Sequence, residues 1–202
     1  MDLKWLPNAL TLLRIGAAPV VAWLVWTATA PEGASTTQAN SLYLAFWIFT
    51  VACLTDWLDG FVARSLNATS DFGAKLDLWA DKIIVFFVLI GMFPDSWGVS
   101  ILGVICLSVR DLYIMRLRAS RPDVSLKASA AAKAKTAIVM VGLAGILLAT
   151  ARIFGDIAAT GDVQNISQMI ATASLLLFVI GCLLSLYTGW QYIAAARAKP
   201  AT

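Results

Sequence analysis

Acidic residues with regular spacing lie within an apolar part of this 202-residue chain, between residues 56 and 81. Helical spacing of three to four residues gives two faces: one carries Asp56, Asp59 or Gly60, and Ala63, and the other carries Gly73, Asp77 and Asp81. Two such helices side by side would bring four carboxylates together. Hard divalent cations such as Mg²⁺ take oxygen ligands of this kind, with substrate phosphates completing the coordination shell. The spacing therefore predicts a divalent-cation site for a phosphorylated substrate.

A structural role is the alternative for these carboxylates. Aspartates near the ends of membrane helices can extend to water or pair with nearby cations, which here are Arg64, Lys75 and Lys82. That explanation suffices for one aspartate, but four on two faces favour function, because unpartnered carboxylates are costly in a membrane. Small residues at fixed offsets would also let a backbone or a nucleotide approach closely: Gly60, Ala63 and Gly73.

The whole pattern resembles the motif of the CDP-alcohol phosphotransferase family, Asp-x2-Asp-Gly-x2-Ala-Arg-x8-Gly-x3-Asp-x3-Asp. Every fixed position is matched, by Asp56, Asp59, Gly60, Ala63, Arg64, Gly73, Asp77 and Asp81. The resemblance implies a membrane transferase that moves a substituted phosphoryl group from a CDP-linked donor to an alcohol and releases CMP.

The resemblance also implies roles for these residues. Two divalent ions, Mg²⁺ or Mn²⁺, would be held by Asp56, Asp59, Asp77 and Asp81. The chain has no histidine, so a carboxylate is the natural general base, and the resemblance assigns that role to Asp81. The nucleotide would lie against Asp56, Gly60, Ala63, Arg64, Gly73 and Asp77. Arg64 could equally be a structural counter-ion for Asp59 or Asp71.

Composition indicates an integral membrane protein, since 60% of the residues are hydrophobic and 13% are charged. We expect one all-α transmembrane domain over residues 1–202, a bundle of about six helices after a short interfacial helix in residues 1–14. The net charge is only +3, and the basic residues form no long tract, so nucleic-acid binding is not expected. The three cysteines are scattered singly and are expected to pack in the core.

Six apolar stretches define the expected spans: 15–31, about 41 into the motif, 72–92, 97–115, 132–153 and 166–195. Basic residues gather in alternate connections, and the other side has little besides Arg152. The positive-inside rule then places both termini and the acidic motif on the cytoplasmic side, as in a bacterial inner-membrane protein. A cleavable secretory signal at the first span is the rival interpretation, because Ala28-Thr29-Ala30 resembles a cleavage site.

Near the N-terminus, a helix starting at Pro7 would place Asn8, Thr11 and Arg14 on one side. One interpretation is an amphipathic interfacial stretch with Arg14 extending to the membrane surface. The segment also resembles the Pro-Asn-x-Leu-Thr-x-x-Arg opening of the phosphatidylglycerophosphate synthase branch. That resemblance implies that these three residues lie near the acceptor or the nucleotide.

A basic region later in the chain suits an acceptor that carries its own phosphate. Its residues are Arg110, Arg118, Lys127, Lys133 and Lys135. A loop made basic by topology alone is the alternative. Lys133-Ala134-Lys135-Thr136 resembles an element of the same branch, which implies glycerol 3-phosphate as acceptor, CDP-diacylglycerol as donor and membrane lipids as surroundings. Homodimers are common in the resembled family, so a homodimer is expected.

Departures from that branch leave the acceptor open. Leu78 stands where a proline is frequent, and Asp111 where a glutamate is frequent. Phosphatidylglycerol, which would give cardiolipin, is an alternative acceptor, as are inositol, inositol phosphate, serine and choline. A divalent-cation transporter is a hypothesis of another class, although it predicts acidic residues through the whole membrane thickness. A family member that binds nucleotide without turnover is a third.

Overall fold

The computed structural model describes the backbone of residues 6–30, 32–65, 71–120 and 130–198, and the side chains of residues 9–30, 32–55, 79–116 and 134–194. Most of these residues are helical, and none of them lies in a strand. The helices are α1 (Leu6–Thr29), α2 (Thr36–Ser65), α3 (Asp71–Gly91), α4 (Phe93–Gly103), α5 (Arg110–Ser120), α6 (Ala130–Thr160) and α7 (Asn165–Ala198). A π-helical segment, η2 (Val104–Val109), joins α4 to α5 without a break.

Local sequence explains where several helices begin and end. Ser35 precedes α2, and its hydroxyl accepts a hydrogen bond from the Gln38 N–H at 3.3 Å, so it caps the helix. Gly161 follows α6 with a φ of +77°, the left-handed conformation that commonly ends a helix. Pro94 lies in the first turn of α4, where its missing N–H costs no helical hydrogen bond.

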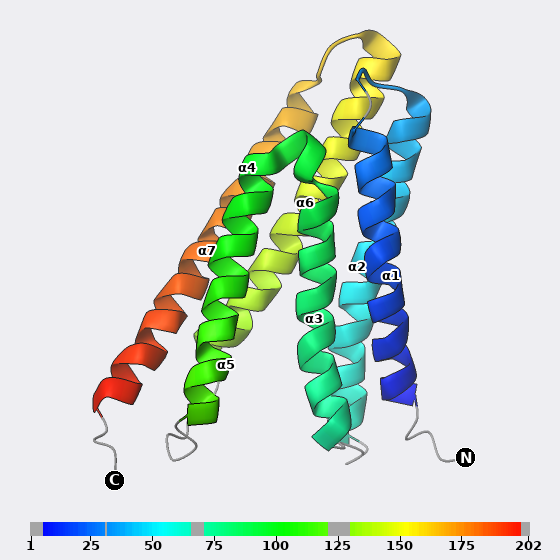
Figure 1. Cartoon of the computed structure of the whole chain (residues 1–202). Helices are drawn as coiled ribbons and strands as arrows, with labels where there is room; N and C mark the ends of the chain where they lie inside the picture. The colour runs from blue at the N-terminus through cyan, green and yellow to red at the C-terminus, as the bar shows by residue number, and fades with distance from the viewer. Residues whose placement is uncertain (1–5, 31, 66–70, 121–129, 199–202) are drawn as a thin grey trace.

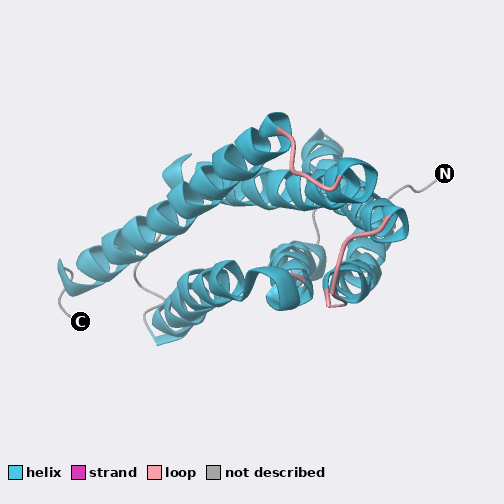
Figure 2. Ribbon diagram, turned by 90° about the horizontal axis from the view of Figure 1, so that it is seen from above, coloured by secondary structure: helices cyan, strands magenta, loops and turns pink. Residues whose placement is uncertain are grey.

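The helices run up and down the bundle, with α6 and α7 inclined relative to α1, α2 and α3 (Figure 1). Helix α1 packs against α2 and α3, α2 packs against α6, and α6 packs against α7. The α4–η2–α5 segment contacts α3 and α7. The first turn of α1 and the last turn of α7 lie at the same end of the bundle, as the basic pattern predicts (Figure 1). Figure 2 shows the same bundle from above, with short loops between α1 and α2 and between α6 and α7 at the opposite end.

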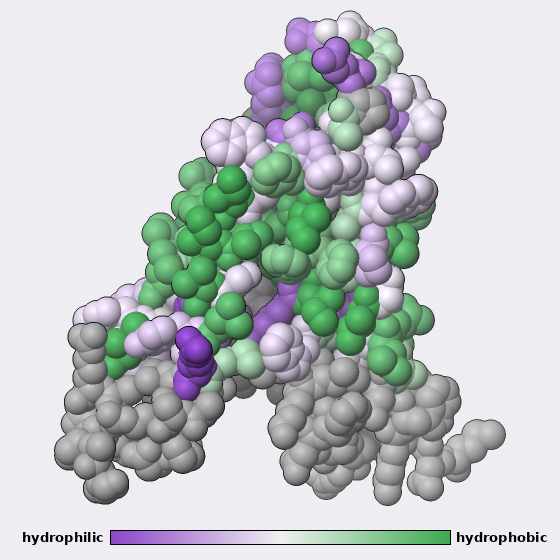
Figure 3. Space-filling view, viewed as in Figure 1, coloured by the Kyte–Doolittle hydropathy of each residue, from purple (hydrophilic) through white to green (hydrophobic). Residues whose placement is uncertain are grey.

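Among the described residues, five helical stretches are long and apolar enough to cross a membrane: Ala9–Thr29, Thr36–Thr55, Phe93–Arg116, Ala134–Thr160 and Asn165–Ala194. Helix α3 has 21 residues, but it contains Asp71, Lys75, Asp77, Asp81 and Lys82. Apolar side chains cover much of the outer surface, as an integral membrane protein requires (Figure 3). The expected all-α membrane bundle is confirmed. Residues 6–14 do not form a separate helix, because they are the first residues of α1.

Helices α6 and α7 approach each other closely at Gly142. A Cβ atom added there would lie 2.7 Å from the Phe178 backbone nitrogen and 2.9 Å from its Cα. Such contacts are too short for a carbon atom, and backbone atoms cannot move aside as a flexible side chain can. Small residues let membrane helices pack in this way.

Gly142→Ala is therefore expected to destabilise the protein by about 1–3 kcal/mol, because α6 and α7 must separate. Gly98→Ala is the matched control, since nothing lies within 4 Å of a Cβ added at Gly98. Thermal unfolding of both purified variants in detergent tests the difference. Equal unfolding midpoints for the two variants would show that α6 and α7 do not meet at Gly142.

Candidate active site

The acidic motif is divided between two helices, as the spacing predicts. Helix α2 carries its first part, Asp56 to Arg64, and α3 carries Gly73, Asp77 and Asp81. Asp77 and Asp81 are separated by about one helical turn. Of these residues, Asp81 is the one whose side chain is described. The convergence of the four carboxylates stays a prediction, because the side-chain positions of the other motif residues lie outside the described part of the structure. These residues are Asp56, Asp59, Gly60, Ala63, Arg64, Gly73 and Asp77.

Arg14 connects α1 to both helices that carry the motif. Its Nη1 lies 3.4 Å from Asp81 Oδ1, and its Nε donates to the Ala52 carbonyl oxygen at 3.3 Å. The Arg14 side chain is 1% exposed, so the expectation that it extends to the membrane surface is wrong. Its charge is satisfied inside the bundle instead. Thr11 is buried one turn earlier, and the Asn8 side chain lies outside the described residues.

A cavity of about 480 Å³ opens between α3, the η2–α5 segment and α6, with Tyr192 of α7 at its edge. One wall is apolar and includes Phe86, Leu89, Leu107 and Val139. The other wall carries charge, with Asp81, Lys82, Arg110, Asp111 and Lys135. In Figure 3 polar residues appear inside the hollow in the lower half of the molecule. The cavity is thus suited to an amphiphilic molecule with an anionic head.

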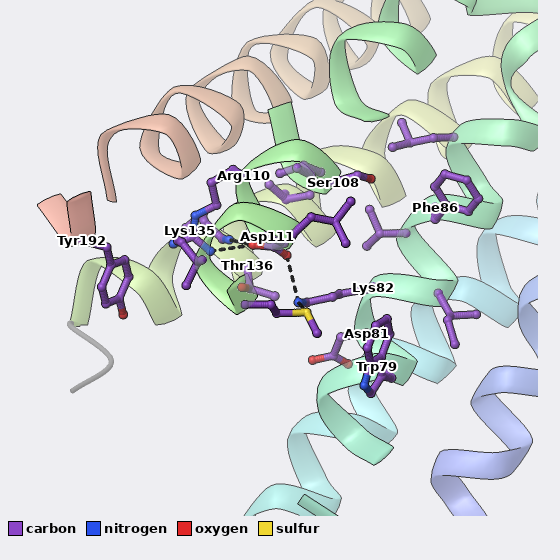
Figure 4. A pocket seen from close by; sticks show the side chains of 18 residues that line it. Trp79, Asp81, Lys82, Phe86, Ser108, Arg110, Asp111, Lys135, Thr136 and Tyr192 are labelled. Atoms are coloured by element: carbon purple, nitrogen blue, oxygen red, sulfur yellow. Dashed lines mark hydrogen bonds and ion pairs between the residues drawn. The ribbon is translucent and has the colours of Figure 1, made fainter. Parts of the chain in front are cut away.

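Three cations on three helices surround one carboxylate in this wall. Asp111 Oδ1 lies 2.6 Å from Arg110 Nη1 and 3.7 Å from Lys135 Nζ, and its Oδ2 lies 3.5 Å from Lys82 Nζ. We call these four residues the cation cluster. Figure 4 shows that Arg110 and Asp111 come from α5, Lys135 from α6 and Lys82 from α3, with Asp81 beside Lys82.

The charge of the cluster is not balanced internally. Three cations and one carboxylate leave a formal charge of +2, and Arg110, Asp111 and Lys135 are at most 17% exposed. Buried like charges are costly unless an anion joins them. A phosphate monoester dianion carries the matching charge and enough oxygen acceptors for several cationic donors. The cluster is therefore a candidate phosphate site.

The structure brings together two residues of the predicted basic region, Arg110 and Lys135. Lys127, and the side chains of Arg118 and Lys133, lie outside the described residues. Lys82 belongs to the cluster but was expected only as a counter-ion for nearby motif aspartates. Its actual partner, Asp111, is 29 positions away in the sequence, so no local pattern could have identified it.

The carboxylates of the motif fit a hard divalent cation by ligand type. Asp81 lines the cavity with its side chain 28% exposed, so its carboxylate is accessible from there. Among the described side chains, no three acidic, histidine or cysteine groups could together hold a metal ion. The other three aspartates of the motif are not in that set.

Comparison with known proteins agrees with the predicted motif. The family model described as CDP-alcohol phosphatidyltransferase matches residues 4–196. A protein of Escherichia coli (strain K12) named CDP-diacylglycerol--glycerol-3-phosphate 3-phosphatidyltransferase is 32% identical over 199 residues, which cover 96% of this chain and 95% of that protein. A protein of Salmonella choleraesuis with the same name is 32% identical over 200 residues, covering 95% and 94%.

Proposed function

Since this chain belongs to the CDP-alcohol phosphatidyltransferase family, we propose that it transfers a phosphatidyl group from CDP-diacylglycerol to glycerol 3-phosphate. The products are CMP and phosphatidylglycerol phosphate, a step of phospholipid biosynthesis. The names of relatives that match nearly the full chain support this acceptor.

The cation cluster is the observation that carries the choice of acceptor. Lys82, Arg110 and Lys135 meet at one wall of the cavity, and Asp81 of the catalytic motif lines the same cavity. An acceptor with a phosphate on one carbon and a hydroxyl on another would place its phosphate at the cluster and its hydroxyl toward Asp81. Inositol, serine and choline carry no phosphate, so they would leave the cluster uncompensated.

The apolar wall of the same cavity supports a lipid donor. An acyl chain of the donor would pack against the apolar side chains of Phe86, Leu89 and Val139, away from water and lipid headgroups. The nucleotide of the donor would lie at the small residues of the motif, Gly60, Ala63 and Gly73, with Arg64 nearby. This arrangement places the reacting phosphorus between the motif and the cluster.

A divalent cation, Mg²⁺ or Mn²⁺, held by Asp56, Asp59, Asp77 and Asp81, would supply charge neutralisation at the diphosphate of the donor. In the reaction, the acceptor oxygen forms a bond to the phosphatidyl phosphorus, and the bond from that phosphorus to the CMP oxygen breaks. Asp81 accepts the hydroxyl proton. Arg14 positions Asp81 by its contact to Oδ1. We place this site and both termini on the cytoplasmic side of a bacterial inner membrane.

Formation of CMP from CDP-diacylglycerol, measured with a panel of acceptors, tests the proposal. We expect rapid CMP release with glycerol 3-phosphate in Mg²⁺ or Mn²⁺, little with glycerol, inositol, serine or choline, and none after chelation of the metal. Release with phosphatidylglycerol but not with glycerol 3-phosphate would assign cardiolipin formation instead. Divalent-cation uptake into vesicles without CMP release would favour a transporter.

Lys135→Ala is expected to raise the KM for glycerol 3-phosphate by roughly 10–100-fold, since a charged hydrogen-bond donor to the phosphate is removed. The KM for CDP-diacylglycerol should change little. Arg116→Ala is the matched control, because Arg116 is an exposed cation that does not line the cavity. Steady-state kinetics with each substrate varied separately measures both constants. An unchanged acceptor KM in Lys135→Ala would exclude Lys135 from the phosphate site.

A further inference from the structure

Helix α7 contacts the side chain of Arg110 through two residues, Thr188 and Tyr192. Arg110 Nη2 donates to Thr188 Oγ1 at 3.0 Å, and the guanidinium carbon lies 5.7 Å from the centre of the Tyr192 ring. Thr188 is 1% exposed and Tyr192 is 8% exposed, so both contacts are shielded from solvent. The attraction between a cation and an aromatic ring is stronger when the pair is buried than when it is exposed to solvent.

Gly189 makes room for this arrangement. A Cβ atom added at Gly189 would lie 3.0 Å from Arg110 Cγ and 3.7 Å from Arg110 Nε. The stem of the arginine therefore passes close to the glycine backbone, where a larger residue would meet it. The two Nη groups then point to different partners, Nη1 to Asp111 and Nη2 to Thr188.

The backbone before Arg110 also departs from a regular α-helix. The π-helical segment Val104–Val109 ends at the residue directly before Arg110. A π-helical turn changes the rotation of the residues that follow it, and such turns are frequent at functional sites. Here the next residue is Arg110, so the π-helical turn sets the direction in which its side chain leaves the helix to contact Asp111 and α7.

We propose that Thr188, Gly189 and Tyr192 form a seat on α7 that positions Arg110 for the phosphate of the acceptor. The seat fixes the plane of the guanidinium group, and a fixed guanidinium binds two phosphate oxygens with correct geometry where a mobile one does not. These are positioning residues, because they act through Arg110. The inference rests on the proposed function and extends it to a helix that carries no part of the acidic motif.

Thr188→Val tests the seat, because valine keeps the shape of threonine but cannot accept the hydrogen bond from Arg110. We expect the KM for glycerol 3-phosphate to rise by about 10-fold. The kcat and the KM for CDP-diacylglycerol should stay within about twofold of wild type. Thr188→Ser keeps the hydroxyl and should behave like wild type. Gly189→Ala should also raise the acceptor KM, since the added methyl group displaces the Arg110 stem.

A double-mutant cycle separates positioning from a general packing role. Arg110→Lys keeps a positive charge but lacks Nη2, so Thr188→Val should have no further effect on acceptor KM in that background. Two results would show that Thr188 does not position Arg110: an equal 10-fold rise in acceptor KM in both backgrounds, or an unchanged acceptor KM in Thr188→Val. If Thr188→Val does not fold, Thr188→Ala is tested in the same cycle. Failure of the wild-type protein to use glycerol 3-phosphate would instead overturn the proposed function and, with it, the inference.

Discussion

Asp81→Asn is expected to lower kcat by about 10²–10⁴-fold, the usual contribution of a positioned general base. Asparagine has nearly the shape of aspartate, but it cannot take up the hydroxyl proton of glycerol 3-phosphate. It is also a poorer ligand for a hard cation. Binding of CDP-diacylglycerol should remain within a few-fold of wild type, because the other three aspartates of the motif are retained. Single-turnover CMP formation and equilibrium binding of the donor measure the two effects separately.

The pairing of Asp81 with Arg14 requires a structural control for this variant. Asparagine leaves the buried Arg14 side chain without its carboxylate partner, so some loss of stability is expected. Thermal unfolding should show that Asp81→Asn is folded at the assay temperature. Asp95→Asn removes an exposed carboxylate at the opposite end of the bundle and should retain full activity. Turnover above about one tenth of wild type in Asp81→Asn would exclude Asp81 as the base.

Asp111→Ala is expected to destabilise the protein by about 2–4 kcal/mol, because it leaves Lys82, Arg110 and Lys135 together without their shared carboxylate. This range lies below that for a fully buried pair, since Asp111 is 17% exposed and water screens part of the repulsion. Loss of the carboxylate raises the formal charge of the cluster from +2 to +3.

Anion binding distinguishes this electrostatic cause from a simple loss of packing. Inorganic phosphate or glycerol 3-phosphate should raise the unfolding midpoint of Asp111→Ala more than that of wild type, because the anion replaces the lost charge. Asp111→Glu keeps the charge and serves as the control. Thermal unfolding over a range of phosphate concentrations is the measurement. An equal shift in all three proteins would show that the anion does not bind at the cluster.

The helices could be predicted well from the sequence because lipid imposes a length and a composition on each of them. In the structure Pro94 lies in the first turn of α4 and Gly161 directly follows α6, and both residue types are common at such helix ends. The beginning of α1 differs from the expectation for a physical reason. Arg14 suggested a membrane-surface segment, yet its partners Asp81 and Ala52 lie on other helices, which an analysis of local hydropathy does not consider.

The candidate site could be predicted only in part. The motif identified Asp81, and the basic region identified Arg110 and Lys135, because charges in an apolar sequence stand out. Thr188 and Tyr192 gave no such signal. They lie 78 and 82 positions after Arg110 in an apolar helix, where a threonine or a tyrosine is unremarkable. Their role follows from helix packing, which brings α5 against α7.

We expect the motif carboxylates to hold the donor diphosphate and its cation at the cavity that the cation cluster lines. Anomalous diffraction from Mn²⁺ in crystals grown with CDP-diacylglycerol tests it most directly. A Mn²⁺ peak is expected within coordination distance of the Asp81 carboxylate and of the other three motif aspartates, at the opening of this cavity. Peaks only at positions remote from Asp81, with the donor bound elsewhere, would contradict it.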